Sequence, residues 1–348
     1  MTLTQEFDFL FQWHLTERCN LKCRHCYQSG MERAELTLAE IGEVSAEIAE
    51  MLADWESVYG VALSPSFNIT GGEPFLREDF FAILAEMAGR GFPLFILSNG
   101  TLIDGTAAER LARLGVKGVQ ISIEGPEEVH EGIRGRGSFA ASLAGVRSLR
   151  DAGLPVTLNV TLSRLNAGQM PAIVDLAASL GVWRLGFSRM VPSGQGAAMI
   201  GQMLATAEVR ELYEWLFALD VPGLEIVSGD PVAAQLNAAP GSPAAAPDIP
   251  CGGCAAGVSG LTILADGTVV PCRRLEIPIG NVRTDSLREI WAGSDVLAGL
   301  RDKGRYRGNC GNCERWAACR GCRAIAYAYS RSQGKDDFLA GDPQCFIR

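Results

Sequence analysis

Eleven cysteines constrain this chain of 348 residues more than any other feature, and they fall into three groups. The first group, Cys19, Cys23 and Cys26, has the CxxxCxxC spacing that can hold three corners of a four-iron cluster. Three thiolates leave the fourth iron without a protein ligand, so that iron can bind a small molecule through nitrogen and oxygen. Zinc binding and a chance occurrence of the spacing are the alternatives, because thiolates also bind zinc.

A second motif lies farther along the chain. Gly71, Gly72 and Glu73 follow the apolar stretch 67–69 and form a GGE sequence. In this order the two motifs resemble the radical S-adenosylmethionine (radical SAM) family. The resemblance implies that the cluster at the three cysteines passes one electron to SAM and releases a 5'-deoxyadenosyl radical, which abstracts hydrogen from a substrate. It also implies that the backbone and carboxylate of the GGE motif hold the SAM amino group.

The same resemblance indicates further SAM contacts. His25 stands just before the last cysteine of the motif, where the family usually has an aromatic residue beside the SAM adenine, and packing there is favoured over iron ligation or proton transfer. Asn99 follows a predicted strand, and Ser122 resembles the residue that contacts the SAM ribose or carboxylate, with strand capping as the alternative. Asn159 interrupts an apolar strand, so it either faces the SAM pocket or is a hydrogen-bonded core amide.

Residues 130–135 form a segment that resembles one common in radical SAM enzymes that modify peptides. Those enzymes usually have Asp where this chain has Glu124 and Glu131. Two roles stay open for these acids: contact with the substrate, or a loop salt bridge with Arg134.

A repeated strand–helix rhythm occupies the first two-thirds of the chain. Thr37 and Glu40 form a capping box at the start of the first helix. Strands are expected near 9–15, 66–70, 93–98, 118–123, 155–162 and 182–188. Parallel neighbours need crossover connections, so six such units predict a parallel sheet with helices outside. The predicted fold is an α/β, partial (β/α)6 TIM-like barrel, which the radical SAM resemblance also implies, with the motifs at the carboxyl ends of the strands.

Composition limits the partners. Charged residues make up 20% of the chain, apolar residues 47%, and the net charge is -9. Binding to a nucleic-acid backbone needs clustered Lys and Arg, so nucleic acid is not an expected partner. The first residues lack the features of a signal peptide, and no uncharged apolar run is long enough to cross a membrane. We therefore expect a cytoplasmic protein without membrane contact, in which cysteines ligate metal rather than form disulfides.

The other eight cysteines lie in the C-terminal part, around a predicted hairpin that turns at Asp266 and Gly267. Eight thiolates are enough for two clusters of four, and a zinc ribbon is the alternative. The order resembles the SPASM extension, which carries two auxiliary four-iron clusters. By that resemblance the inner cluster would be held by Cys251, Cys254, Cys272 and Cys322. The outer cluster would be held by Cys310, Cys313, Cys319 and Cys345.

These features divide the chain. A stretch rich in Ala, Pro and Gly predicts a linker or mobile loop at 226–250, between a barrel at 1–225 and a SPASM domain at 251–348. The resemblance implies three four-iron clusters and SAM as cofactors, and a flavodoxin or ferredoxin as the electron donor. The run that begins at Cys322 looks like the subgroup that trims haem precursors and like some peptide maturases.

Two substrate hypotheses follow. The first is a maturase that abstracts hydrogen from a peptide or protein residue, and the second is an enzyme that oxidises or decarboxylates tetrapyrrole propionates. Anaerobic sulfatase-maturating enzymes have an Asp directly after the cysteine that matches Cys272, whereas this chain has Arg273 and then Arg274. These two arginines could pair with substrate carboxylates or be structural. The short stretch before the first predicted strand leaves no room for the winged-helix peptide-binding domain often fused to such maturases, and a separate partner protein could supply it. A non-catalytic electron carrier, the third hypothesis, would need neither the GGE motif nor a barrel.

Overall fold

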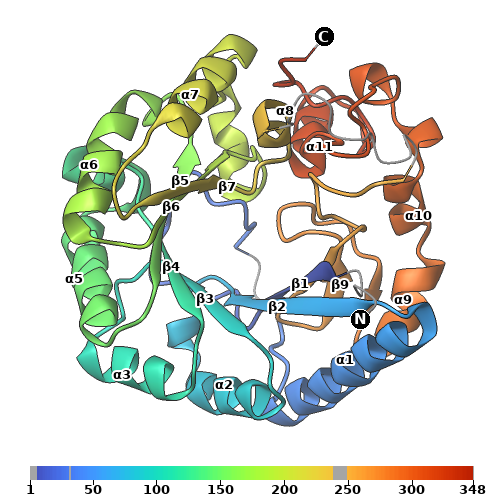
Figure 1. Ribbon diagram of the computed structural model, residues 1–348, viewed down its shortest axis with the longest axis horizontal. Coiled ribbons are helices and arrows are strands. Elements are labelled where there is room, and N and C mark those ends of the chain that lie inside the picture. Colours follow the sequence, from blue (N-terminus) through green and yellow to red (C-terminus); the bar gives the residue numbers. More distant parts are fainter. Residues whose placement is uncertain (1–5, 31–32, 238–248, 348) are drawn as a thin grey trace.

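The computed structural model describes residues 6–30, 33–237 and 249–347 (Figure 1). The strands are β1 (Glu6–His14), β2 (Ala62–Thr70), β3 (Leu94–Ser98), β4 (Gly118–Ser122), β5 (Val156–Leu162), β6 (Arg184–Arg189), β7 (Glu225–Ser228), β8 (Gly260–Ile263), β9 (Thr268–Val270) and β10 (Gly280–Asn281). The helices are α1 (Leu38–Tyr59), α2 (Phe80–Gly89), α3 (Gly105–Arg113), α4 (Glu127–Arg134), α5 (Ser138–Asp151), α6 (Met170–Leu180), α7 (Thr206–Ala218), α8 (Ala234–Asn237), α9 (Leu287–Gly293), α10 (Asp295–Arg301) and α11 (Arg323–Ser332).

One sheet joins the described strands in the order β10-β9-β8-β1-β2-β3-β4-β5-β6-β7. All neighbours from β8 through β1 to β7 are parallel, and the β8–β9 and β9–β10 pairs are antiparallel. Figure 1 shows this sheet curved, with α1, α2, α3, α5, α6 and α7 around its outside. The predicted partial barrel is therefore confirmed, with the C-terminal extension beside its open side.

The first helix shows why the local signals are reliable here. The Thr37 hydroxyl accepts from the Glu40 amide, and the Glu40 carboxylate accepts from the Thr37 amide, so the predicted capping box is present. The buried face of α1 carries Ile41, Val44 and Ile48, whose spacing of three and four places them on the side that faces the sheet. This packing holds the first crossover against the barrel.

All six predicted strands are present, and the structure adds two parallel strands. The strand β7 has only four residues and none of them is fully buried, so it lacks the apolar pattern that marks the others. The strand β8 pairs with β1 from Leu10 to Trp13, so the first strand of the predicted hairpin extends the barrel sheet. The cysteine-rich extension is thus joined to the barrel through backbone hydrogen bonds.

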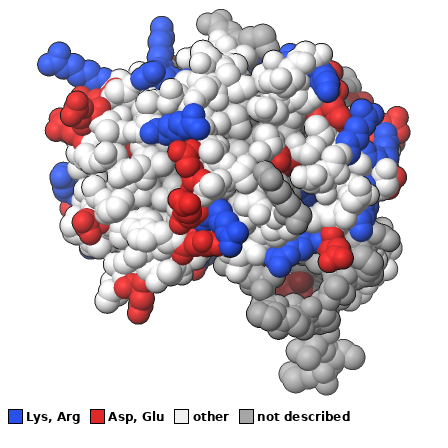
Figure 2. All heavy atoms as spheres, turned by 90° about the horizontal axis from the view of Figure 1, so that it is seen from above, with Lys and Arg blue, Asp and Glu red and all other residues white. Residues whose placement is uncertain are grey.

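The predicted linker at 226–250 begins with ordered structure. It contains most of β7, a short 3-10 helix (Pro231–Ala233) and α8. Residues 238–248 lie outside the described residues. In the described part of the chain, no helix combines the length and the apolar character that crossing a membrane requires. Acidic and basic side chains are interspersed on the face shown in Figure 2.

Candidate active site

The loop that follows β1 carries the CxxxCxxC motif, and the glycines after β2 hold it in place. The Gly72 amide donates to the Thr16 carbonyl oxygen at 2.8 Å, and the Glu73 amide donates to the Arg18 carbonyl oxygen at 2.8 Å. A Cβ at Gly71 would overlap the Thr16 carbonyl oxygen, and one at Gly72 would overlap that of Arg18. Only glycine allows this close approach of two backbones.

A cavity opens at the carboxyl ends of the barrel strands, and we call it the cluster-loop cavity. Its lining includes all three thiols of the first motif, together with polar residues that follow β2, β3 and β4. The predicted site residues that line it are Cys19, Cys23, His25, Cys26, Gly71, Gly72, Asn99, Ser122 and Asn159. The structure therefore brings together these residues, which lie on or after five strands of one sheet, β1 to β5.

Glu73 is fully buried and does not line the cluster-loop cavity, but it bonds to residues that do. Its carboxylate accepts hydrogen bonds from the Ser98 hydroxyl at 2.9 Å and from the Asn99 amide at 2.8 Å. Burial raises the pKa of Glu73 to about 7, and these hydrogen bonds oppose the rise. The carboxylate thus ties the end of β2 to the loop after β3, which positions the Asn99 side chain 4.0 Å from the Cys19 sulfur.

A buried charged group lies on the other side of the thiols. The Glu124 carboxylate accepts from Arg134 Nε at 2.9 Å and Nη2 at 2.5 Å, so the salt bridge left open by the sequence is present. His25 Nε2 lies 3.2 Å from the same carboxylate. Burial alone would raise the pKa of Glu124, but the Arg134 and His25 charges hold it at about 2. Glu131 instead accepts from the Gly137 amide at 2.7 Å.

The donor set fits an iron–sulfur cluster. Burial raises the pKa of the Cys23 thiol to about 11, and the Arg134 charge opposes this rise. Arg134 Nη1 lies 3.8 Å from the Cys23 sulfur, so a fixed cation stands where a thiolate must form. Ligation by three thiolates beside a cavity lined with polar groups is the arrangement that an open cluster iron and a small polar ligand require.

A second cavity, here called the interior cavity, lies inside the barrel and reaches the extension. Among its described lining residues the charged side chains are Arg273 and Arg274, and both also line the cluster-loop cavity. Its neutral polar lining includes Gln12, Asn68, Gln120, Thr157, Asn159, Ser188 and Thr262. Arg274 Nη1 donates to the Ser188 hydroxyl at 3.4 Å, whereas its buried Nε has no partner within the described residues. The two cavities thus share Arg273 and Arg274, which make their common lining positively charged.

Several contacts involve the cysteines of the extension. Cys254, Cys272 and Cys322 line the interior cavity, and the Cys251 amide donates to the Ala317 carbonyl oxygen at 2.9 Å. Gln235 Nε2 bridges the sulfurs of Cys319 and Cys345 at 3.4 and 3.6 Å. The Cys313 amide donates to the Cys310 carbonyl oxygen at 3.4 Å. Three members of the predicted inner set thus line one cavity, and the division into an inner and an outer set stays a prediction.

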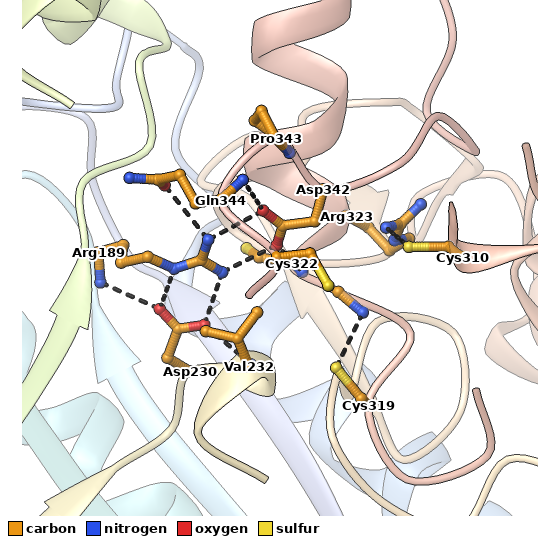
Figure 3. Close-up of polar contacts among 12 residues, drawn as sticks. Arg189, Asp230, Val232, Cys310, Cys319, Cys322, Arg323, Asp342, Pro343 and Gln344 are labelled. Atoms are coloured by element: carbon orange, nitrogen blue, oxygen red, sulfur yellow. Dashed lines mark hydrogen bonds and ion pairs between the residues drawn. The ribbon is translucent and has the colours of Figure 1, made fainter. Parts of the chain in front are cut away.

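Figure 3 shows a buried ion network that joins the barrel to the extension. Arg189, at the end of β6, pairs with Asp230 at 2.7 Å and with Asp342 at 2.8 Å. Asp342 also accepts from the Cys322 amide at 2.8 Å, and the Gln344 side chain accepts from Arg189 at 3.2 Å. Sequence analysis did not identify Arg189, Asp230, Asp342 or Gln344. The one available signal was a charged residue that ends an apolar strand.

Comparison with known proteins identifies the family. A model for the Radical SAM superfamily matches residues 13–177, and a model for the SPASM iron-sulfur cluster-binding domain matches residues 254–323. The AdoMet-dependent heme synthase of Nitratidesulfovibrio vulgaris is 32% identical over 97% of this chain and 91% of its own. The chain belongs to the radical SAM superfamily. It is an enzyme with a SPASM extension, and membership implies iron–sulfur clusters and SAM as cofactors.

Two further likenesses bear on this radical SAM enzyme. The mycofactocin maturase MftC of Mycolicibacterium smegmatis is 31% identical over 90% of this chain and 78% of its own. The crystal structure of Streptococcus suis SuiB bound to S-adenosylmethionine superposes with a TM-score of 0.73 at 17% identity, covering 98% of this chain and 78% of SuiB. The SuiB likeness concerns the fold, whereas the names of the two sequence relatives refer to different products, heme and mycofactocin.

Proposed function

We propose that this radical SAM enzyme acts on a tetrapyrrole that carries propionate side chains, and that it oxidises or decarboxylates them. The supporting observation is the interior cavity, whose described lining has Arg273 and Arg274 as its charged side chains. Two guanidinium groups among neutral amides and hydroxyls favour a ligand with several carboxylates. The heme synthase relative, which aligns with nearly the whole chain, supports the same substrate class.

We further propose three four-iron clusters. Cys19, Cys23 and Cys26 would hold the first, and the inner and outer sets of the extension would hold the other two. With SAM bound, the first cluster supplies a 5'-deoxyadenosyl radical for hydrogen abstraction. The proposed SAM-contacting residues are His25, Gly71, Gly72, Glu73, Asn99, Ser122 and Asn159. Of these, Glu73 would act mainly by positioning Asn99, because its carboxylate is occupied by Ser98 and the Asn99 amide.

The chain's own residues would then orient the substrate. Arg274 is anchored on Ser188 and lines both cavities, so a substrate carboxylate there could pair with its guanidinium. The Arg273 guanidinium lies 5.7 Å from the centre of the Tyr27 ring, which belongs to the cluster loop. A propionate held by these two side chains would lie between the first motif and the inner set of thiols.

A peptide or protein maturase is the second candidate, and the likeness to a mycofactocin maturase favours it. An acidic peptide residue could use the same two arginines. We propose a separate peptide-binding partner protein for this case. For both candidates we propose a flavodoxin or ferredoxin as the electron donor and a cytoplasmic location. The domain limits that we propose are 1–225 for the barrel, 226–250 for the connection and 251–348 for the extension.

The test begins with iron. Anaerobic reconstitution is expected to give about twelve irons per chain, with about four lost when the first three cysteines become Ala. Iron-coproporphyrin is then added with SAM and a reductant, and 5'-deoxyadenosine and the mass of the porphyrin are measured. A porphyrin that loses carbon dioxide or hydrogen supports the proposal. Tight binding with no product, together with turnover of an acidic precursor peptide, would favour the maturase.

Binding of the porphyrin gives a sharper measurement. Arg273→Gln and Arg274→Gln should each weaken porphyrin affinity about tenfold or more, because a charge-assisted hydrogen bond contributes about 1.5–3 kcal/mol. Arg288→Gln on α9 is the matched control, since this arginine is 42% exposed and pairs with Asp54 at the surface. Equal affinities for all three variants, measured by absorbance titration, would remove the basis of the substrate assignment.

A further inference from the structure

Two side-chain nitrogen donors contact the predicted outer set of thiols. Gln235 Nε2 lies 3.4 Å from the Cys319 sulfur and 3.6 Å from the Cys345 sulfur. Arg323 Nη2 lies 3.5 Å from the Cys310 sulfur, as Figure 3 shows. Three of the four sulfurs assigned to the outer cluster therefore have a side-chain N–H within reach. The two donors come from different parts of the chain, α8 and the first residue of α11.

Arg323 is held as a buried cation at this position. The side chain is 0% exposed, and its Nη1 donates to the Ala340 carbonyl oxygen at 2.7 Å. The guanidinium lies 4.9 Å from the centre of the Tyr306 ring, which covers it. No carboxylate forms an ion pair with it within the described ranges. A buried charge needs a compensating partner: the Asp342 carboxylate acts on Arg323 without forming an ion pair, and a thiolate at Cys310 would be the anion in direct contact.

Gln235 is similarly placed for sulfur rather than oxygen. It is 9% exposed, its side-chain oxygen has no partner in the described part of the chain, and its amide nitrogen contacts only the two sulfurs. Arg315 holds the backbone of Gln235 in place, because its Nη1 donates to the backbone carbonyl oxygen of Gln235 at 2.8 Å. Burying an amide with its oxygen unpaired costs stability, and the contacts of its N–H groups with the two sulfurs are what can offset this cost.

We infer that Arg323 and Gln235 tune the outer auxiliary cluster by raising its reduction potential. This inference depends on the proposed assignment of the outer cluster. A four-thiolate cluster gains one negative charge on reduction, so a fixed cation and N–H donors at the sulfurs stabilise the reduced form more than the oxidised form. The low dielectric of the buried site strengthens both effects. The two residues are positioning residues, since they touch ligands and not substrate.

The experiment is a redox titration of the anaerobically reconstituted full chain, followed by electron paramagnetic resonance. The outer signal is identified as the one lost in Cys345→Ala. Arg323→Met and Gln235→Met should each lower the ratio of reduced to oxidised outer cluster at least tenfold at a fixed potential, which is about 59 mV for one electron. Gln235→Glu should lower the ratio further, because it replaces the N–H donors by a negative charge. Arg323→Lys should keep most of the parent value.

Arg331→Met is the matched control, because it removes the same charge from the same helix at a side chain that is 67% exposed. Its outer signal, and the signal of the first cluster in every variant, should titrate as in the parent. The inference would be overturned if the outer cluster of Arg323→Met and of Gln235→Glu kept the reduction potential of the parent while about twelve irons stayed bound. That result would leave the cluster assignment intact. If Arg323→Met fails to assemble the cluster, the reduction potentials of Gln235→Met and Gln235→Glu decide the test. A parent chain with about eight irons or fewer would overturn the cluster assignment and the inference together.

Discussion

Replacing Arg189 by Met would leave two buried carboxylates without their cation. Arg189 donates to both oxygens of Asp230, at 2.7 and 2.8 Å, and to both oxygens of Asp342, at 2.9 and 2.8 Å. All three side chains are at most 2% exposed. The variant therefore removes the centre of the network that joins β6 to the C-terminal loop.

The structure gives the size of the effect. Burial alone would raise the pKa of Asp230, but the Arg189 charge lowers it from 3.8 to about 2. At neutral pH this difference corresponds to about 2.5 kcal/mol of stability from one carboxylate. Breaking a buried pair by removing one partner costs about 3–5 kcal/mol, which agrees in order of magnitude. We expect a loss in this range for Arg189→Met.

The assay is anaerobic thermal unfolding of the reconstituted protein. Arg184→Met is the matched control, because it lies on the same strand and pairs with Glu225 where the two side chains are 36% and 47% exposed. Such a surface pair contributes about 1 kcal/mol or less. Asp230→Asn combined with Arg189→Met should recover part of the loss, since it removes one uncompensated charge. The variant should also lose auxiliary-cluster iron, because Asp342 holds the Cys322 amide.

Equal melting temperatures for Arg189→Met and Arg184→Met would refute the reasoning. That result would mean that water or a local rearrangement compensates the two aspartates. A loss of stability with all auxiliary iron retained would refute only the link to the thiols. It would leave the network as a structural joint between barrel and extension.

Two other substitutions test the cluster-loop cavity. Gly72→Ala should reduce iron by about four per chain, because the new Cβ would overlap the Arg18 carbonyl oxygen beside the first motif. Gly89→Ala is the control, since a Cβ at Gly89 would have no atom within 4 Å. This control should keep full iron and gain up to about 1 kcal/mol of stability. Glu73→Gln should flatten the pH dependence of stability. Burial raises the pKa of Glu73 from 4.5 to about 7, so between these values the folded protein holds a proton that the unfolded chain has lost. The stability of the parent therefore falls as pH rises through that interval, and the variant lacks this effect. Thermal unfolding of parent and variant from about pH 5.5 to 8 checks this, and parallel curves would contradict it.

The parts of the fold that sequence predicts are those with a local pattern. The strands around Phe67, Ile121 and Leu158 have apolar runs that end at polar motif residues, and parallel connections place those ends together. The first cysteine motif lies within eight residues of one loop, so its spacing alone indicates a shared site. Segment β7 lacks such a pattern, and its strand state comes from pairing with β6.

The polar contacts of the site could not be predicted in the same way. Arg189 and Asp342 are 153 residues apart, and nothing near either residue indicates the other. The Glu73 carboxylate is bonded to Ser98 and Asn99 because the ends of β2 and β3 meet, which a motif by itself does not show. Sequence left the pairing of Glu124 and Arg134 open, and their close contact depends on α4 turning back over the cluster loop.

Buried arginines lie beside cysteine thiols in this chain, although its net charge is -9. Arg134 lies beside Cys23, Arg274 lines the cavity of the inner set, and Arg323 contacts Cys310. Burial disfavours each charge, so each position needs an anion nearby. Arg134 has Glu124 as a partner, but no ion pair joins Arg274 or Arg323 to a carboxylate where the structure is described. Under the proposed cluster assignment, thiolates would be the anions in direct contact with these arginines, and net charge, which counts surface and interior alike, does not reveal this arrangement.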